Sequence, residues 1–150
     1  MEFNILSGDL FSSPEAASLH EGSGCALVHC ISADFALGKG IAKEFDQRYA
    51  VKDELRRIFA NCNENLVGHC IYVCGVLNLV TKQFYYNKPT YETLRSSLVS
   101  MRNLCLANHI RRVAMPCIGC GLDRLVWQLV VQIIRDVFQN TDVTITVYVK

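Results

Sequence analysis

Hydrophobic residues along this chain follow two alternating patterns. Short runs rich in β-branched residues predict strands, and the segments between them carry apolar residues at every third or fourth position, as helices do. The predicted strands are residues 3–6, 25–31, 70–74, 76–81, 112–115 and 143–149. In the last run, Ile145, Val147 and Val149 alternate with other residues. This period of two predicts an edge strand or a strand covered on one face.

Three segments have a clear helical period. The segment 91–107 follows Pro89, has Thr90 as a suitable N-cap and ends before Asn108. Its predicted buried stripe consists of Leu94, Leu98, Met101 and Cys105. The segments 41–49 and 125–138 each begin after a glycine-rich stretch. Helices that alternate with short strands predict a layered α/β fold.

Composition limits the chain to one domain, residues 1–150. A hydrophobic fraction of 51% in 150 residues is sufficient for one core, and no repeat, charge block or Ser/Gly/Pro-rich stretch divides the sequence. The 15 Lys and Arg against 14 Asp and Glu give a net charge of +1. This balance predicts no broad polyanion-binding face and no sequence-specific binding of nucleic acid, so an anionic ligand must be held locally.

The eight cysteines favour free thiols over a disulfide scaffold, because a chain of this size needs no covalent staples. Cys25, Cys30, Cys70 and Cys74 lie in apolar runs, as small buried hydrophobic residues do. The chain begins without the pattern of a signal peptide, and none of its apolar runs reaches membrane-spanning length. We therefore expect a soluble, monomeric intracellular protein in the nucleus, the cytoplasm or both.

A first glycine-rich turn, residues 36–42, lies between a predicted strand and a predicted helix. Backbone amides in such a turn can point at an anion, which favours phosphate binding at Gly38 and Gly40. A dinucleotide fingerprint needs glycine where Lys43 stands, and a P-loop needs Ser or Thr where Gly40 stands. The alternative is a turn that only requires a positive φ angle.

A second glycine-rich loop, residues 116–123, also follows a strand and precedes a helix. Two such loops at neighbouring strand ends predict that a diphosphate is held between them. Cys117 and Cys120 also match a redox dithiol pattern. Thioredoxin-type proteins carry a cis-proline strand downstream of that dithiol, whereas Pro116 is the last proline here. No second pair of cysteines has the spacing of a zinc site, so we expect no metal.

Lys82 and Asp123 are the candidate reactive groups. Lys82 follows the predicted buried strand 76–81, where functional side chains often emerge. The alternatives are a solvent-exposed lysine at a strand end and, for Asp123, a simple N-cap of the helix expected near Leu125. His29, inside a predicted strand, is interpreted as a core residue rather than a base.

Several motifs recur together in one family of proteins. They are SGDLF (7–11), VHCIS (28–32), GKGIA (38–42), KPTYE (88–92), MP (115–116), IGCGLDRL (118–125) and TITVY (144–148). In this order and over nearly the whole chain, the sequence resembles the macrodomains, in particular the terminal ADP-ribose protein glycohydrolases, also described as O-acetyl-ADP-ribose deacetylases. The resemblance implies a three-layer α/β/α fold with a mixed central sheet and ADP-ribose in a cleft at the strand ends.

The resemblance also assigns binding roles. Asp9 and the Leu10 backbone would recognise adenine, and Ser32 would approach the distal ribose. The diphosphate would lie between two groups of residues, Gly38, Gly40, Ile41 and Ala42 on one side and Ile118, Gly119, Cys120, Gly121 and Leu122 on the other. Many other macrodomain hydrolases carry an asparagine near the position of Ser32, so their water-based mechanism is not transferred to this chain.

The activity implied by the resemblance uses Lys82 as nucleophile on the anomeric carbon of the distal ribose and Asp123 as acid/base. It would release ADP-ribose from glutamate or aspartate side chains of proteins and deacylate O-acetyl-ADP-ribose, without cofactor or metal. The expected partners are ADP-ribose and ADP-ribosylated proteins, with poly(ADP-ribose) as a further candidate ligand. The alternative is a module that binds ADP-ribose without cleaving it.

Overall fold

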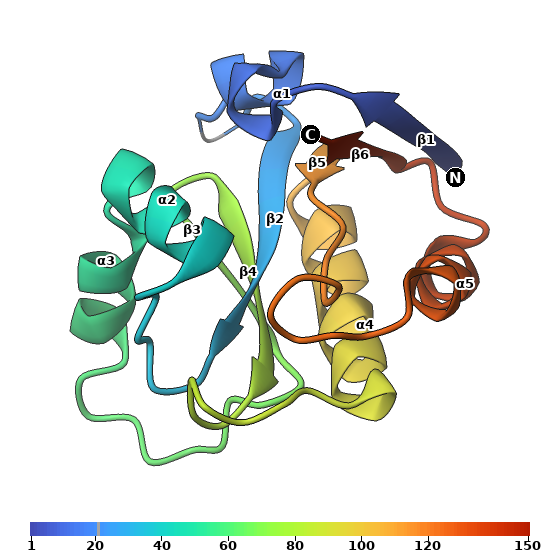
Figure 1. The fold of residues 1–150 in the computed structure, drawn as a ribbon. Coiled ribbons are helices and arrows are strands. Elements are labelled where there is room, and N and C mark those ends of the chain that lie inside the picture. Colours follow the sequence, from blue (N-terminus) through green and yellow to red (C-terminus); the bar gives the residue numbers. More distant parts are fainter. Residues whose placement is uncertain (21) are drawn as a thin grey trace.

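One mixed six-stranded sheet forms the centre of the molecule (Figure 1). The structure, a computed structural model, describes residues 1–20 and 22–150. The strands are β1 Glu2–Ser7, β2 Cys25–Ser32, β3 Cys70–Val73, β4 Val76–Lys82, β5 Arg112–Met115 and β6 Thr144–Val149. Their order is β1-β6-β5-β2-β4-β3, and every neighbouring pair is parallel except β3 and β4. The expected mixed sheet is confirmed.

Helices cover both faces of this sheet (Figure 1). They are α1 Pro14–Ala17, α2 Gly40–Tyr49, α3 Val51–Ile58, α4 Tyr91–Ala107 and α5 Trp127–Phe138, and a 3-10 turn, η1, spans Leu10–Ser12. Side chains of β4 alternate between two cores: Leu77 and Leu79 pack with α4 and α5, whereas Val76 and Val80 pack with α2 and α3. The three-layer α/β/α arrangement is confirmed. None of the helices in the described residues is both long and apolar enough to cross a bilayer.

Helix α4 has the bounds that its sequence pattern predicts. The predicted stripe is completely enclosed by the core and consists of Leu94, Leu98, Met101 and Cys105. Thr90 is the N-cap, as expected, and its hydroxyl accepts a hydrogen bond from Thr93 N at 3.0 Å. Local signals therefore determine both ends of this helix, which begins immediately after the region of the candidate site.

Of the two alternatives for the last strand, the edge strand is excluded, because β1 pairs with the outer side of β6 in parallel from Glu2 to Ser7. One predicted helix start is wrong. Helix α5 begins at Trp127 instead of near Leu125, since Arg124 has a left-handed backbone with φ of 60° and Val126 is the N-cap. The second glycine loop is therefore longer than predicted and extends over residues 116–126.

The cysteines differ in how deeply they are buried. Cys25 and Cys70 are buried and Cys30 is partly buried, as predicted, but Cys74 is exposed. Cys74 forms the corner of the turn between β3 and β4 with a φ of 55°, so its side chain points away from the core. All eight cysteines are free thiols.

Candidate active site

Three loops meet at one edge of the sheet, because β2, β4 and β5 are parallel neighbours whose carboxyl ends lie together. The loops are residues 33–39, 83–90 and 116–126. The start of α2, directly after the first loop, lies close to the third loop: a Cβ atom at Gly40 would be 3.4 Å from Leu122 Cδ1. The adjacency that the two-loop prediction assumed is therefore present, and Figure 1 shows the 116–126 loop beside the end of β2.

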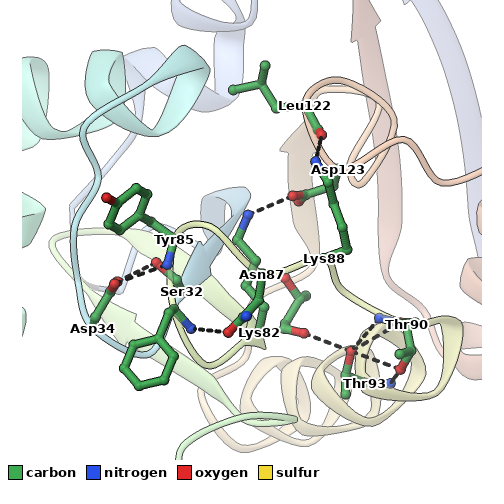
Figure 2. Close-up of polar contacts among 12 residues, drawn as sticks. Ser32, Asp34, Lys82, Tyr85, Asn87, Lys88, Thr90, Thr93, Leu122 and Asp123 are labelled. Carbon is green, nitrogen blue, oxygen red and sulfur yellow. Dashed lines mark hydrogen bonds and ion pairs between the residues drawn. The ribbon is translucent and has the colours of Figure 1, made fainter.

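Lys82 and Asp123 form an ion pair at this edge (Figure 2). Lys82 Nζ lies 2.7 Å from Asp123 Oδ1, and the two side chains are only 15% and 14% exposed. Lys82 is thus not a solvent-exposed lysine at a strand end. Asp123 is not the N-cap of α5 either, since Val126 occupies that position. The structure brings together the two residues proposed as reactive groups.

The position of Lys82 is fixed from two sides. As the last residue of β4 it pairs with Ser32 of β2, just after a register shift between Ile31 and Ser32. On the other side, the Thr93 hydroxyl in the first turn of α4 donates to Thr81 O at 2.7 Å (Figure 2). The backbone that carries the lysine is therefore attached both to the neighbouring strand and to a helix.

The loop that carries Asp123 is supported by residues near the start of α4. Lys88 Nζ donates to Leu122 O at 2.7 Å, and the Tyr91 hydroxyl accepts a hydrogen bond from Val126 N at 2.9 Å. Both residues belong to the KPTYE motif, in which Pro89 and Thr90 mark the start of the helix. The structure gives Lys88 and Tyr91 a physical role, because they hold the second loop against the segment that follows Lys82.

Asp34 is a site residue that the sequence interpretation missed. Its Oδ1 accepts a hydrogen bond from Ser32 Oγ at 2.5 Å and its Oδ2 accepts one from Tyr85 N at 3.0 Å (Figure 2). Oδ1 also accepts a hydrogen bond from Ala36 N at 3.1 Å. Desolvation raises the pKa of Asp34, but these hydrogen bonds outweigh that effect and lower the pKa. An aspartate two residues after a strand is typical of an Asx turn, and this was the available signal.

The first glycine loop presents backbone amides at the start of α2. Gly40 begins the helix with a φ of 59°, and Lys39, the N-cap residue, makes no side-chain capping bond. The first amides of the helix, including those of Ile41 and Ala42, therefore donate no hydrogen bond to a capping side chain, which is the arrangement that binds phosphate groups. Across from them lies the second loop, with Gly119 at a φ of 75°. The ligand contacts of Gly38 to Ala42 and Ile118 to Leu122 stay predictions.

Asp9 and Leu10 lie farther away along the same edge. They follow β1, which β6 and β5 separate from β2, so the structure does not place them beside Lys82. The Asp9 carboxylate caps η1 by accepting hydrogen bonds from Phe11 N at 3.1 Å and Ser12 Oγ at 3.2 Å. The bond from Phe11 is the main reason that the pKa of Asp9 is lowered. Their recognition of adenine stays a prediction.

The thiols around the pair are held in the neutral form. Burial raises the pKa of Cys30 to about 12, with a further increase from the Asp123 carboxylate and an opposing effect of Lys82. Burial also raises the pKa of Cys120 to about 11 and that of Cys117. Redox-active dithiols need a stabilised thiolate. The dithiol interpretation therefore finds no support.

Comparisons with known proteins agree with this geometry. A family model described as Macro domain matches residues 28–134. A Bos taurus protein named ADP-ribose glycohydrolase OARD1 is 43% identical in an alignment of 145 positions that covers 94% of this chain and 87% of that protein. The macrodomain of Mycobacterium tuberculosis DarG matches the fold with a TM-score of 0.81 at 23% identity, covering 99% of this chain and 97% of that one. Thermosipho africanus DarTG in complex with ADP-ribose gives a TM-score of 0.78 at 17% identity, covering 100% of this chain and 42% of that one.

Proposed function

The chain belongs to the macrodomain family, and from that premise we propose that it hydrolyses the bond between ADP-ribose and protein carboxylates, with Lys82 as nucleophile and Asp123 as acid/base. The observation that carries this proposal is the 2.7 Å contact between Lys82 Nζ and Asp123 Oδ1 at the edge where the two glycine loops meet. The name of the bovine relative supports hydrolysis of an ADP-ribose bond. The proposed substrates are ADP-ribosylated glutamate and aspartate side chains, and O-acetyl-ADP-ribose.

The layout of the strand ends suggests how ADP-ribose binds. The adenine would lie near Asp9 and Leu10, at the end of β1, and the distal ribose near Ser32, at the end of β2. The diphosphate between them would cross the start of α2, where backbone amides and the helix dipole favour an anion. In this pose the anomeric carbon of the distal ribose faces the Lys82–Asp123 pair.

The proposed reaction starts from the ion pair. A proton moves from the Lys82 ammonium to the Asp123 carboxylate, because only a neutral amine is a nucleophile. The Lys82 nitrogen then bonds to the anomeric carbon, and the bond from that carbon to the ester oxygen breaks, so that the protein carboxylate leaves with the electron pair. The nitrogen passes one proton to the departing carboxylate, and transfer of the Asp123 proton to the ring oxygen opens the ribose to a protonated imine.

Water completes the cycle. It adds to the imine carbon with Asp123 as base, the Lys82 amine is expelled, and ADP-ribose is released. The net reaction consumes one water molecule and yields ADP-ribose and a free carboxylic acid. A carboxylate is a stable leaving anion, so esters of glutamate, aspartate and acetate suit this mechanism better than linkages to arginine or serine.

Lys82→Arg separates the charge of the lysine from its nucleophilicity. Arginine keeps a cation beside Asp123 but stays protonated, so release of ADP-ribose from a glutamate-modified protein is expected to fall on the order of a thousandfold or more. Affinity for ADP-ribose, measured by calorimetry, should change only by a few fold, because a nucleophile acts mainly on the barrier. Lys82→Ala should lose activity equally.

The covalent step has a direct readout. Asp123→Ala removes the base for hydrolysis of the imine, so at a pH high enough to deprotonate Lys82 without Asp123, denaturing mass spectrometry after incubation with substrate should find ADP-ribose mass on the Lys82 peptide. Near-normal turnover by Lys82→Arg would show that the covalent mechanism is wrong. If the unmutated protein binds ADP-ribose and cleaves none of the proposed substrates, its function is that of a reader of ADP-ribosylation.

A further inference from the structure

Three consecutive aromatic side chains lie on the surface directly after the catalytic strand. Phe84, Tyr85 and Tyr86, here called the aromatic segment, are 42%, 59% and 66% exposed. The rings of Phe84 and Tyr86 are stacked with centroids 5.4 Å apart, and the Tyr85 ring meets that of Tyr86 edge-on at 5.3 Å. Contiguous exposed apolar surface of this kind marks binding sites, and aromatic residues are enriched in protein interfaces.

The backbone of the aromatic segment is held in place. Phe84 N donates to Asn87 Oδ1 at 2.9 Å and Asn87 N donates to Phe84 O at 2.9 Å, which closes a turn. Tyr85 N donates to Asp34 Oδ2 at 3.0 Å and so fastens the turn to the first loop of the site (Figure 2). A surface that is already ordered loses little conformational entropy when a partner binds.

The position of the segment follows from the end of β4. The strand ends at Lys82, two residues before Phe84, and the contact between Tyr85 and Asp34 keeps the segment beside Ser32. The aromatic segment therefore lies beside Ser32, where the proposed pose places the distal ribose. In the proposed pose, the group bonded to the anomeric carbon that Lys82 attacks leaves the site past this segment.

We propose that the aromatic segment is the docking surface for the polypeptide that carries ADP-ribose, and that it gives the protein a preference for protein-linked over small ADP-ribose esters. This inference rests on the proposed function. The polypeptide is covalently attached to the anomeric carbon that Lys82 attacks. The residues that flank the modified carboxylate therefore lie next to the aromatic segment. Exposed tyrosines bind peptide backbone and apolar side chains at low entropic cost.

The charges near the segment favour a polypeptide over poly(ADP-ribose). Each unit of that polymer carries two phosphates, which require accessible cations. The flanking cations, Lys82 and Lys88, are engaged with the Asp123 carboxylate and with Leu122 O. The Asp34 carboxylate beneath Tyr85 repels phosphate further.

The test compares two substrates that share ADP-ribose and differ in the leaving group. In the double variant Tyr85→Ala/Tyr86→Ala, KM for a glutamate-ADP-ribosylated protein is expected to rise about tenfold or more with little change in kcat. Kinetics on O-acetyl-ADP-ribose should stay within about twofold, since acetate does not reach the segment. Tyr85→Phe/Tyr86→Phe keeps the rings and should retain the preference. Leu106→Ala, a half-exposed apolar residue at the far end of α4, is the matched surface control.

Each other outcome overturns the inference. Equal effects on both substrates would place the tyrosines in the ADP-ribose cleft, and no effect on either would leave the segment without a substrate role. Loss of poly(ADP-ribose) binding with unchanged turnover of the modified protein would make the polymer the occupant. Calorimetry in the Lys82→Arg background separates docking from catalysis: the alanine variant should weaken binding of the modified protein about tenfold and leave that of free ADP-ribose unchanged. If the unmutated protein cleaves neither substrate, the proposed function fails while this binding difference still decides the docking surface.

Discussion

His29 lies in the middle of β2 and is completely buried. Its ring stacks on Phe45 with centroids 4.0 Å apart, and its Nε2 lies 2.6 Å from Asn78 Oδ1. Desolvation lowers the pKa of His29 to about 4, and the hydrogen bond to Asn78 only partly opposes this shift. His29 is therefore a neutral core residue near pH 7, as the sequence interpretation held.

This pKa makes the stability of the protein depend on pH. An unfolded histidine has its ordinary pKa near 6.5, so between pH 6.5 and about 4 the unfolded chain binds a proton that folded His29 does not bind. The stabilisation is complete above pH 6.5 and decreases as the pH falls towards 4. From this residue alone, we expect the free energy of unfolding to be about 2 kcal/mol lower at pH 5 than at pH 7.

Urea denaturation at both pH values measures this difference. His29→Gln lacks the titrating ring, so whatever its stability at pH 7, its loss between pH 7 and pH 5 should be about 2 kcal/mol smaller than that of the unmutated protein. Equal losses in the two proteins would show that His29 is not the group responsible.

Gly119 determines the shape of the second glycine loop. Its φ is 75°, and a Cβ atom there would lie 2.8 Å from Leu125 Cδ1. The residue also closes the loop, because Leu125 N donates to Gly119 O at 2.6 Å. A side chain at this position would require both a strained backbone and a displaced leucine.

Gly119→Val should therefore weaken ADP-ribose binding on the order of a hundredfold and lower the free energy of unfolding by about 2 kcal/mol. Calorimetry and urea denaturation measure the two effects. Gly121→Ala is the matched control for stability, because a Cβ atom at Gly121 would meet no atom within 4 Å. If Gly119→Val and Gly121→Ala have equal stability, backbone strain at Gly119 is not what shapes the loop.

Local pattern predicted most elements of the sheet and its longer helices. Strand β5 and helix α4 have the predicted bounds, because period, capping and flanking residues agree there. Helix α3 was not predicted: Ala50 separates it from α2 with a left-handed φ of 54°, which alanine does not signal. The pairing of β1 outside β6 joins the two ends of the chain, so no local period reveals it.

The candidate site shows the same division. Lys82 and Asp123 were found from their places after a strand and in a glycine loop and from the family resemblance, but their 2.7 Å contact joins residues 41 positions apart. That contact depends on strand order and on the support that Lys88 and Tyr91 give to the second loop. Asp34 was not predicted, because it contacts both its own loop, at Ala36 N, and the loop after β4, at Tyr85 N. The second contact is between residues far apart in the sequence.

Across the whole molecule, a buried carboxylate joins the N-terminal segment to the sheet. The Glu15 side chain in α1 is only 3% exposed. It accepts hydrogen bonds from Arg112 Nη2 of β5 at 3.1 Å and from the Tyr148 hydroxyl of β6 at 3.0 Å. Desolvation raises the pKa of Tyr148, as do its hydrogen bond to Glu15 and the charge of that carboxylate. These contacts hold η1, which Asp9 caps, against the strands.

Arg112→Ala should lower the free energy of unfolding by about 2 kcal/mol, because it leaves the buried Glu15 charge with Tyr148 alone. In a Glu15→Gln background no buried charge remains, so the same substitution should cost less than about 1 kcal/mol, and a double-mutant cycle in urea measures the difference. Arg111→Ala is the matched control. The neighbouring arginine pairs with Asp142 at 3.3 Å on the open surface, where an ion pair contributes little. Two results would contradict this role of the Glu15 carboxylate. One is an equally small loss in the free energy of unfolding for Arg112→Ala and Arg111→Ala. The other is the same loss for Arg112→Ala whether Glu or Gln stands at position 15.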